Sequence, residues 1–204
     1  MTKILISVPI SQLYLFLGKC FSYPEERFCA AMKETQAEEE LRTIVEGLPF
    51  EVNFKGISSW ALSQDEFGAD YIGSFDINPA CPLYESGYRT DELSRRDILE
   101  ELLRFYEHFD IKLSDQEKDY PDHLAVELEF MAFLAQKEAG ALEQGKNPDP
   151  YRRAQMDFLE RHLSKWVHQL DEGIQKKINE PFYRQASTLM AEFIRGHLSY
   201  LLRI

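Results

Sequence analysis

The chain is poor in the residues that build disulfide frameworks and metal sites. It has only three cysteines, Cys20, Cys29 and Cys81, and none of them forms a Cys-x-x-Cys pair. An odd and sparse set of cysteines does not indicate a disulfide framework, and without paired Cys or His ligands it does not predict a zinc site. We therefore expect reduced thiols, as in proteins of the cytosol.

Long apolar runs are also missing. No stretch reaches the ~20 apolar residues that a membrane-spanning helix needs. Residues 4–17 are largely apolar and could pass for a signal peptide, but Pro9, Ser11 and Gln12 interrupt them and no small-residue cleavage pattern follows. We expect a cytoplasmic protein without stable membrane insertion.

Positive charge is scarce. Lys and Arg number 23 against 35 Asp and Glu, which gives a net charge of −12. Residues 151–204 hold nine basic and six acidic residues, a balance of +3, so residues 1–150 carry a balance of −15. A chain this acidic is unsuited to nucleic acid, whose binding depends on neutralising phosphates. It suits a basic peptide partner.

Motifs of enzymes are absent as well. The chain has no Gly-rich phosphate loop, no Gly-x-Ser-x-Gly and no His-Glu-x-x-His. The nearest approach to a metal site is His123 with Glu127 one helical turn later and Asp122 beside it. A closed site needs three or four ligands, so we predict no catalytic residue, bound metal or cofactor. A helical metal-dependent hydrolase centred on Asp122, His123 and Glu127 is the alternative from another class.

Apolar residues recur at helical spacing nearly throughout the 204 residues. The pattern predicts helices over 11–21, 25–45 (one or two), 57–75, 91–109, 121–139, 151–170 and 182–202. Breaks are expected around 47–56, 76–87 and 140–150, where proline and glycine gather. No stretch alternates convincingly at period two, so we predict an all-α helical bundle. The aromatic stripe within 57–75 favours a place in the core: Trp60, Phe67, Tyr71 and Phe75.

The stretch that opens with Pro121, Asp122 and His123 is the most informative. Proline is tolerated at the first helical position because the first N–H groups of a helix have no intrahelical partner. A carboxylate favours the same turn, since it faces the positive end of the helix dipole. The stretch therefore predicts a well-capped helix start at Pro121. The apolar residues expected to be buried along this helix are Leu124, Leu128, Met131 and Leu134 or Ala135.

This Pro-Asp-His helix resembles the hallmark of the TorD/DmsD/NarJ family. A second matching segment is Cys81-Pro82-Leu83-Tyr84-Glu85-Ser86-Gly87-Tyr88, and a weaker one is Leu13-Tyr14-Leu15-Phe16-Leu17 running into Phe21-Ser22-Tyr23-Pro24. The three segments occur in the family's order and at roughly its spacing. The resemblance implies a TorD-like bundle forming one domain, residues 1–204. Its N-terminal helical group would span about 1–110, a hinge about 110–120 and a C-terminal group about 121–204.

The resemblance also implies a function. Members of the family are cytoplasmic chaperones that bind the twin-arginine leader of a molybdenum (or tungsten) bis-pterin oxidoreductase and hold its catalytic subunit back from export until the cofactor is inserted. Some members serve subunits that lack an exported leader, so a NarJ-like role stays open. The Cys-Pro-Leu-Tyr-Glu form of the loop favours exported clients of the type II dimethyl sulfoxide reductase-like class. Either a monomer or a dimer is compatible with such a bundle.

The residues that match the family's leader-binding positions are Pro121, Asp122 and His123, with Tyr84 and Tyr88 at the aromatic positions. Adding Glu127, one turn into the helix, completes the predicted peptide-binding set. A carboxylate can accept a guanidinium in bidentate fashion, and tyrosine faces can stack on a cation. The chain departs from the best-known members because tyrosine stands at both aromatic positions, where tryptophan can occur, and Cys81 replaces a second proline.

Overall fold

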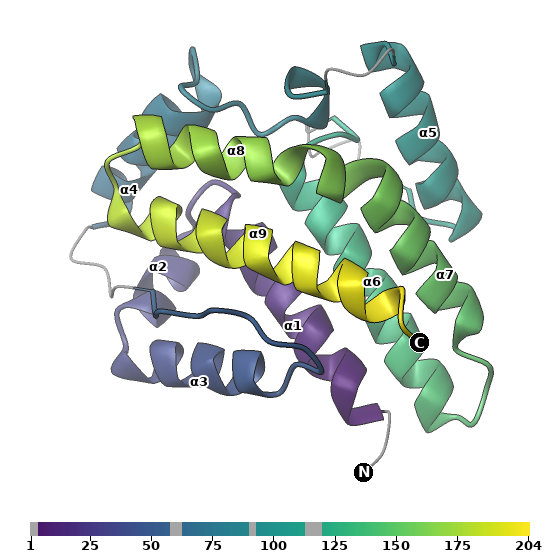
Figure 1. The fold of residues 1–204 in the computed structure, drawn as a ribbon. Helices are drawn as coiled ribbons and strands as arrows, with labels where there is room; N and C mark the ends of the chain where they lie inside the picture. The colour runs from purple at the N-terminus through teal and green to yellow at the C-terminus, as the bar shows by residue number, and fades with distance from the viewer. Residues whose placement is uncertain (1–3, 58–62, 90–92, 113–119) are drawn as a thin grey trace.

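The computed structural model describes residues 4–57, 63–89, 93–112 and 120–204, and the regular elements among these residues are helices, with no strand (Figure 1). The predicted all-α fold is therefore confirmed. The α-helices are α1 Ile4–Cys20, α2 Glu26–Met32, α3 Thr35–Glu46, α4 Gln64–Tyr71, α5 Arg95–His108, α6 Leu124–Glu143, α7 Asp149–Phe158, α8 Ser164–Lys177 and α9 Pro181–Leu201. Two π-helices, η1 Ile72–Asp76 and η3 Leu159–Leu163, and a 3-10 turn, η2 Glu85–Gly87, join them.

Helices α1 and α6 make the most extensive contact of the bundle. Leu13 and Leu17 on α1, and Leu128 and Met131 on α6, are fully buried. Helices α8 and α9 run antiparallel, side by side, across one face of the molecule (Figure 1). The apolar positions predicted for α6 are all fully buried, which confirms the helical stripe read from the sequence.

The aromatic stripe is part of the core, as predicted. Phe67, Tyr71 and Phe75 are buried, and the rings of Phe67 and Phe75 lie 5.0 and 4.8 Å from the ring of Tyr183 on α9. Trp60 lies outside the described residues. Burial of these large rings ties α4 and η1 to the C-terminal helices.

Some helix boundaries differ from prediction. Helix α1 begins at Ile4 rather than at residue 11, and Pro9 lies inside it. The ring of Pro9 packs against the end of α3, where a Cβ on Gly47 would come within 3.0 Å of it. Tertiary packing here outweighs the tendency of proline to end a helix. The loop expected at 140–150 is shorter than predicted, because α6 continues to Glu143 and α7 starts at Asp149.

The predicted division into two helical groups stays a prediction. Most of the expected hinge, residues 113–119, lies outside the described residues. Within the described ones, buried residues from α1 to α9 belong to a single hydrophobic core. None of the described helices is both long and apolar enough to cross a bilayer.

One segment departs from the expectation that no stretch alternates at period two. We call residues 48–57 the strap; they connect α3 to the chain that leads into α4 and pass along α9 (Figure 1). The strap's side chains alternate between half-buried and exposed: Phe50, Val52 and Phe54 point inward, and Glu51, Asn53 and Lys55 outward. The alternation is strand-like, although residues 51–57 belong to no regular element.

Candidate functional site

The start of α6 differs from prediction by three residues. His123, not Pro121, stands at the N-terminal boundary, and its ring nitrogen Nδ1 accepts a hydrogen bond from the Ala125 N–H at 3.2 Å. Helix α6 begins at Leu124, while Pro121 and Asp122 lie in the turn before it. The imidazole of His123 therefore caps the helix, and Asp122 lies before the first turn rather than in it, where its carboxylate contacts the neighbouring loop.

That neighbouring loop is the second matching segment, residues 81–89. The Glu85 N–H donates to the Asp122 carbonyl at 2.9 Å, and the Leu124 N–H donates to the Leu83 carbonyl at 2.8 Å. The Ser86 N–H donates to the Asp122 carboxylate oxygen Oδ2 at 3.2 Å. These hydrogen bonds hold the loop against the start of α6, so the two segments singled out by sequence lie side by side.

The two predicted tyrosines lie at different points of this contact. The Tyr84 ring is 5.1 Å from the His123 ring and 6.2 Å from the ring of Tyr120, which is 53% exposed. The Tyr88 ring stacks on the indole of Trp166 in α8 at 5.5 Å. Both tyrosines are half-buried. Tyr84 and Tyr120, with the half-buried Pro121, form an aromatic rim on the surface, whereas Tyr88 faces inward.

The two carboxylates of the predicted peptide-binding set do not lie at the surface. Asp122 and Glu127 are both fully buried, because the loop 81–89 covers the turn before α6. Each keeps one carboxylate oxygen, Oδ1 of Asp122 and Oε1 of Glu127, without a hydrogen-bond partner among the described residues. Buried polar atoms are nearly always satisfied, so two orphaned carboxylate oxygens at one helix start are unusual.

Sequence reasoning missed the residues that surround these acids. Glu85 is fully buried; it forms an ion pair with Arg89, and its Oε2 lies 2.9 Å from Nδ1 of the buried His162. The Trp166 indole N–H donates to Glu127 Oε2 at 3.4 Å. His162 belongs to the π-helix η3, a type of bulge that is frequent at functional sites. No local signal links Glu85 to His162, because the tertiary fold alone brings them together.

We call Glu85, Asp122 and Glu127 the buried acid cluster. Burial raises the pKa of the Glu127 carboxyl well above its usual range, and the charge of Glu85 raises it further, while the hydrogen bond from Trp166 acts in the opposite direction. Burial, reinforced by the same three acids, also raises the pKa of Tyr106, whose hydroxyl donates to the Pro121 carbonyl at 2.8 Å. The start of α6 is thus a buried region with a surplus of acidic groups.

This arrangement predicts a gain in stability for Glu127→Gln. Because the pKa of Glu127 is raised in the folded state, there is a pH range above 4.5 in which the folded protein keeps the carboxyl proton and the unfolded protein has lost it. The wild type therefore loses stability as the pH rises above 4.5. Glutamine copies the shape of the protonated carboxyl and does not titrate. By urea unfolding, the variant should be more stable than the wild type by on the order of 1–3 kcal/mol near pH 8. The difference should vanish near pH 4; a variant less stable than the wild type near pH 8 would contradict the expectation.

The geometry gives no support to the hydrolase alternative. Within the described ranges, no group of three or more His, Cys, Asp or Glu side chains is arranged to hold a metal ion. The His123 nitrogen Nδ1 is occupied by the helix cap.

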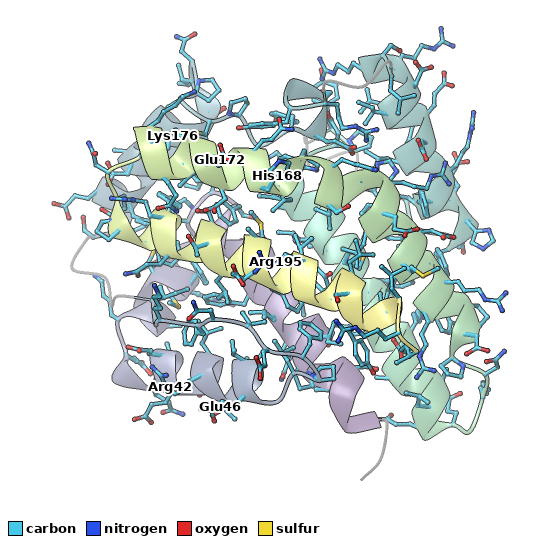
Figure 2. The ribbon with its side chains drawn as sticks, in the orientation of Figure 1. Arg42, Glu46, His168, Glu172, Lys176 and Arg195 are labelled. Carbon is cyan, nitrogen blue, oxygen red and sulfur yellow. The ribbon has the colours of Figure 1, made fainter. Side chains whose placement is uncertain are left out.

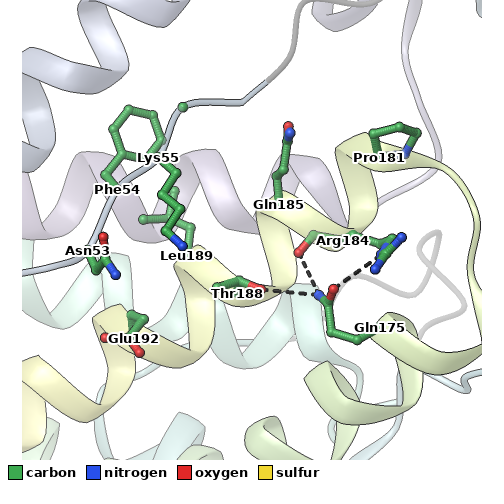
Figure 3. Close-up of a pocket in the computed structure, with 11 residues that line it drawn as sticks. Asn53, Phe54, Lys55, Gln175, Pro181, Arg184, Gln185, Thr188, Leu189 and Glu192 are labelled. Carbon is green, nitrogen blue, oxygen red and sulfur yellow. Dashed lines mark hydrogen bonds between the residues drawn. The ribbon is translucent and has the colours of Figure 1, made fainter.

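A separate cavity lies away from the buried acid cluster. It measures about 360 Å³ and opens between the strap and the N-terminal half of α9, with Gln175 of α8 on its wall (Figure 3). Gln175 is held by hydrogen bonds to Thr188 and to the Arg184 carbonyl. None of the predicted peptide-binding residues lines this cavity, so the cavity and the buried acid cluster are different places.

Comparison with known proteins places the chain among relatives of known role. The sequence profile of the family described as Nitrate reductase delta subunit matches residues 30–172. The chain is 34% identical over 191 residues to the selenate reductase assembly chaperone protein of Thauera selenatis, and equally to the chlorate reductase assembly chaperone protein of Ideonella dechloratans. Each alignment covers 92% of this chain and 87% of the relative. It is 28% identical over 141 residues to the chaperone protein TorD of Vibrio parahaemolyticus serotype O3:K6, covering 69% of this chain and 60% of the relative.

Proposed function

The chain belongs to the TorD family of redox enzyme maturation proteins, described as the Nitrate reductase delta subunit family, and we propose that its partner is the catalytic subunit of a molybdenum (or tungsten) bis-pterin oxidoreductase. It is an assembly chaperone rather than an enzyme. The proposal is carried by the 34% identity, over 92% of the chain, to assembly chaperones named for selenate and chlorate reductases. The chaperone would hold the subunit until its cofactor is inserted and before export.

The proposal extends to the subunit's twin-arginine leader. The aromatic rim of Tyr84, Tyr120 and Pro121 offers apolar and stacking contacts at the surface, and the guanidinium of Arg95, 4.7 Å from the centre of the Tyr120 ring, already makes a contact of this kind. At the adjoining start of α6, the orphaned oxygens of Asp122 and Glu127 are acceptors suited to a guanidinium. An arginine of the leader would supply the missing hydrogen-bond donors and the missing positive charge together.

Access to these acids requires the loop 81–89 to shift, because Asp122 and Glu127 are fully buried. The loop is held on α6 and on the turn before it by the ring contact of Tyr84 with His123, by two backbone hydrogen bonds, and by a hydrogen bond from the Ser86 N–H to the carboxylate of Asp122. A guanidinium that binds Asp122 competes directly with the last of these. We infer that leader binding and loop displacement are coupled, with His123 and Tyr88 repositioned by the same shift.

Capture of the tagged protein from its native host tests the proposal. Mass spectrometry of the retained proteins should identify one large molybdopterin-family catalytic subunit with its leader uncleaved. Recovery of such a subunit with no leader in its gene would instead support a NarJ-like role, which the family's description as a nitrate reductase subunit favours. Recovery of no oxidoreductase from cells that express one would overturn the chaperone assignment of its partner.

A further inference from the structure

The face of the molecule formed by α2, α3 and the strap is strongly acidic. Residues 25–57 hold four basic and eight acidic residues, a balance of −4. In α3 the acids follow one another from Glu38 to Glu40, and Glu46 ends the helix. This face is separate from the buried acid cluster, whose residues come from 85–127.

An open hollow of about 810 Å³ lies on this face, between the C-terminal end of α3, the strap and α9. Figure 2 labels Glu46 on α3 and Arg195 on α9, at two of its sides. Its apolar wall consists of side chains that are buried or half-buried: Val45, Leu48, Pro49, Phe50 and Val52. The hollow therefore combines an apolar wall with an acidic surrounding.

The charges at the hollow's edge do not cancel. Glu192 and Arg195, both on α9, form an ion pair with each other at 2.5 Å and leave no net charge. Glu46 and Glu51 are exposed, and neither forms an ion pair with a cation of the described residues. Two uncompensated carboxylates thus border the apolar wall.

The hollow is preformed, because its central side chain is firmly anchored. The Phe50 ring stacks on Phe193 and His197 of α9, at 5.9 and 5.8 Å. Gly196 makes this possible, since a Cβ there would come within 2.6 Å of the ring. A surface already held in its binding conformation loses little conformational freedom on binding.

We propose that this hollow binds a basic, apolar segment of a partner protein, with Lys or Arg side chains directed at Glu46 and Glu51 and apolar side chains against Leu48, Phe50 and Val52. Charge complementarity selects this occupant: an acidic segment would be repelled by the whole face, and a purely apolar one would leave the two carboxylates unused. The inference rests on the proposed function only for the identity of the partner, which would then be the client subunit.

A model peptide tests the proposal without knowledge of the partner. A short peptide of alternating lysine and leucine should bind the full-length protein, measured by fluorescence anisotropy, and its glutamate–leucine counterpart should not. The double variant Glu46→Gln/Glu51→Gln should weaken binding of the lysine peptide roughly fivefold to tenfold, as two partly exposed charge contacts would. The matched control Glu107→Gln/Glu143→Gln removes the same charge at exposed positions of α5 and α6 and should leave affinity unchanged.

Equal weakening in both double variants would overturn the proposal, since it would mean that the peptide responds only to net charge. Nuclear magnetic resonance should localise the bound lysine peptide through shifts of amides in 48–53 and 192–196; shifts confined to other residues would also overturn it. If a twin-arginine leader peptide binds the wild type and the Glu46→Gln/Glu51→Gln variant equally well, the proposed leader site is not contradicted. If leader binding is lost only in Asp122 variants, that result says nothing against the hollow. The proposed leader site and the proposed hollow can therefore be refuted independently.

Discussion

Replacing Glu85 by glutamine is expected to lower the free energy of unfolding by about 3–5 kcal/mol, the range measured when one partner of a buried ion pair is removed. The Glu85 side chain is fully buried, and that of its partner Arg89 is 5% exposed. Glutamine keeps the shape of the side chain but removes the negative charge that Glu85 places against the buried guanidinium. The hydrogen bond to His162 also loses its ionic acceptor. Urea unfolding near neutral pH, followed by circular dichroism, measures the loss.

The variant Glu100→Gln provides the matched control. It removes the partner of Arg96, at 2.7 Å, in an ion pair whose side chains are 86% and 44% exposed. Exposed pairs contribute only about 0–1 kcal/mol, so this change should have little effect. If Glu85→Gln cost no more than Glu100→Gln, the buried pair would not stabilise the loop 81–89, and the reasoning that this loop closes over the acids would be wrong.

Asp122→Asn is expected to weaken binding of a twin-arginine leader peptide by roughly tenfold to a hundredfold, which corresponds to the ~1.5–3 kcal/mol of a hydrogen bond to a charged group. The amide oxygen of asparagine can still accept the Ser86 N–H that Asp122 accepts at 3.2 Å. Stability should therefore change by less than about 1 kcal/mol. Alanine is less informative, because it would leave that N–H unsatisfied and open a cavity. Isothermal titration calorimetry and thermal unfolding separate the two effects.

Two controls sharpen this test. Asp157→Asn removes the same charge from an exposed position of α7 and should leave leader affinity unchanged. A leader peptide with two lysines in place of its arginines should bind the wild type more weakly, because an ammonium cannot form the bidentate contact, and should lose less on Asp122→Asn. If Asp122→Asn lowered stability but not affinity, Asp122 would be a structural residue of the turn, and the proposed leader site would be wrong.

The helices and the core follow from properties that any short window of the sequence contains. A period near 3.6 in apolar residues placed Leu128 and Met131 in the core, and both are fully buried. The aromatic stripe of Phe67, Tyr71 and Phe75 was correctly assigned to the core for the same reason. The strand-like alternation of the strap was overlooked, since its six residues from Phe50 to Lys55 are few and follow a proline.

The sequence was sufficient to locate the candidate site but not to predict the contacts within it. The Pro-Asp-His and Cys-Pro-Leu-Tyr segments were both singled out, and the loop hydrogen bonds do bring them together. The sequence did not indicate that Asp122 and Glu127 are covered. Burial of a charged side chain depends on what another segment lays over it, and nothing in the local pattern encodes that.

By itself the sequence determined the all-α class, the buried faces of the helices, the acidic balance and the family. These properties depend on composition, on short periodic patterns and on motifs that can be recognised without knowledge of the fold. Only the tertiary structure decided that Glu85 meets Arg89 and His162, that two carboxylate oxygens remain orphaned at the start of α6, and that Phe50 packs against Gly196 to anchor an acidic hollow. The physical reason is that desolvation and pairing of polar groups are set by contacts between segments far apart in the chain, whereas helix formation is set largely by neighbours within a few turns.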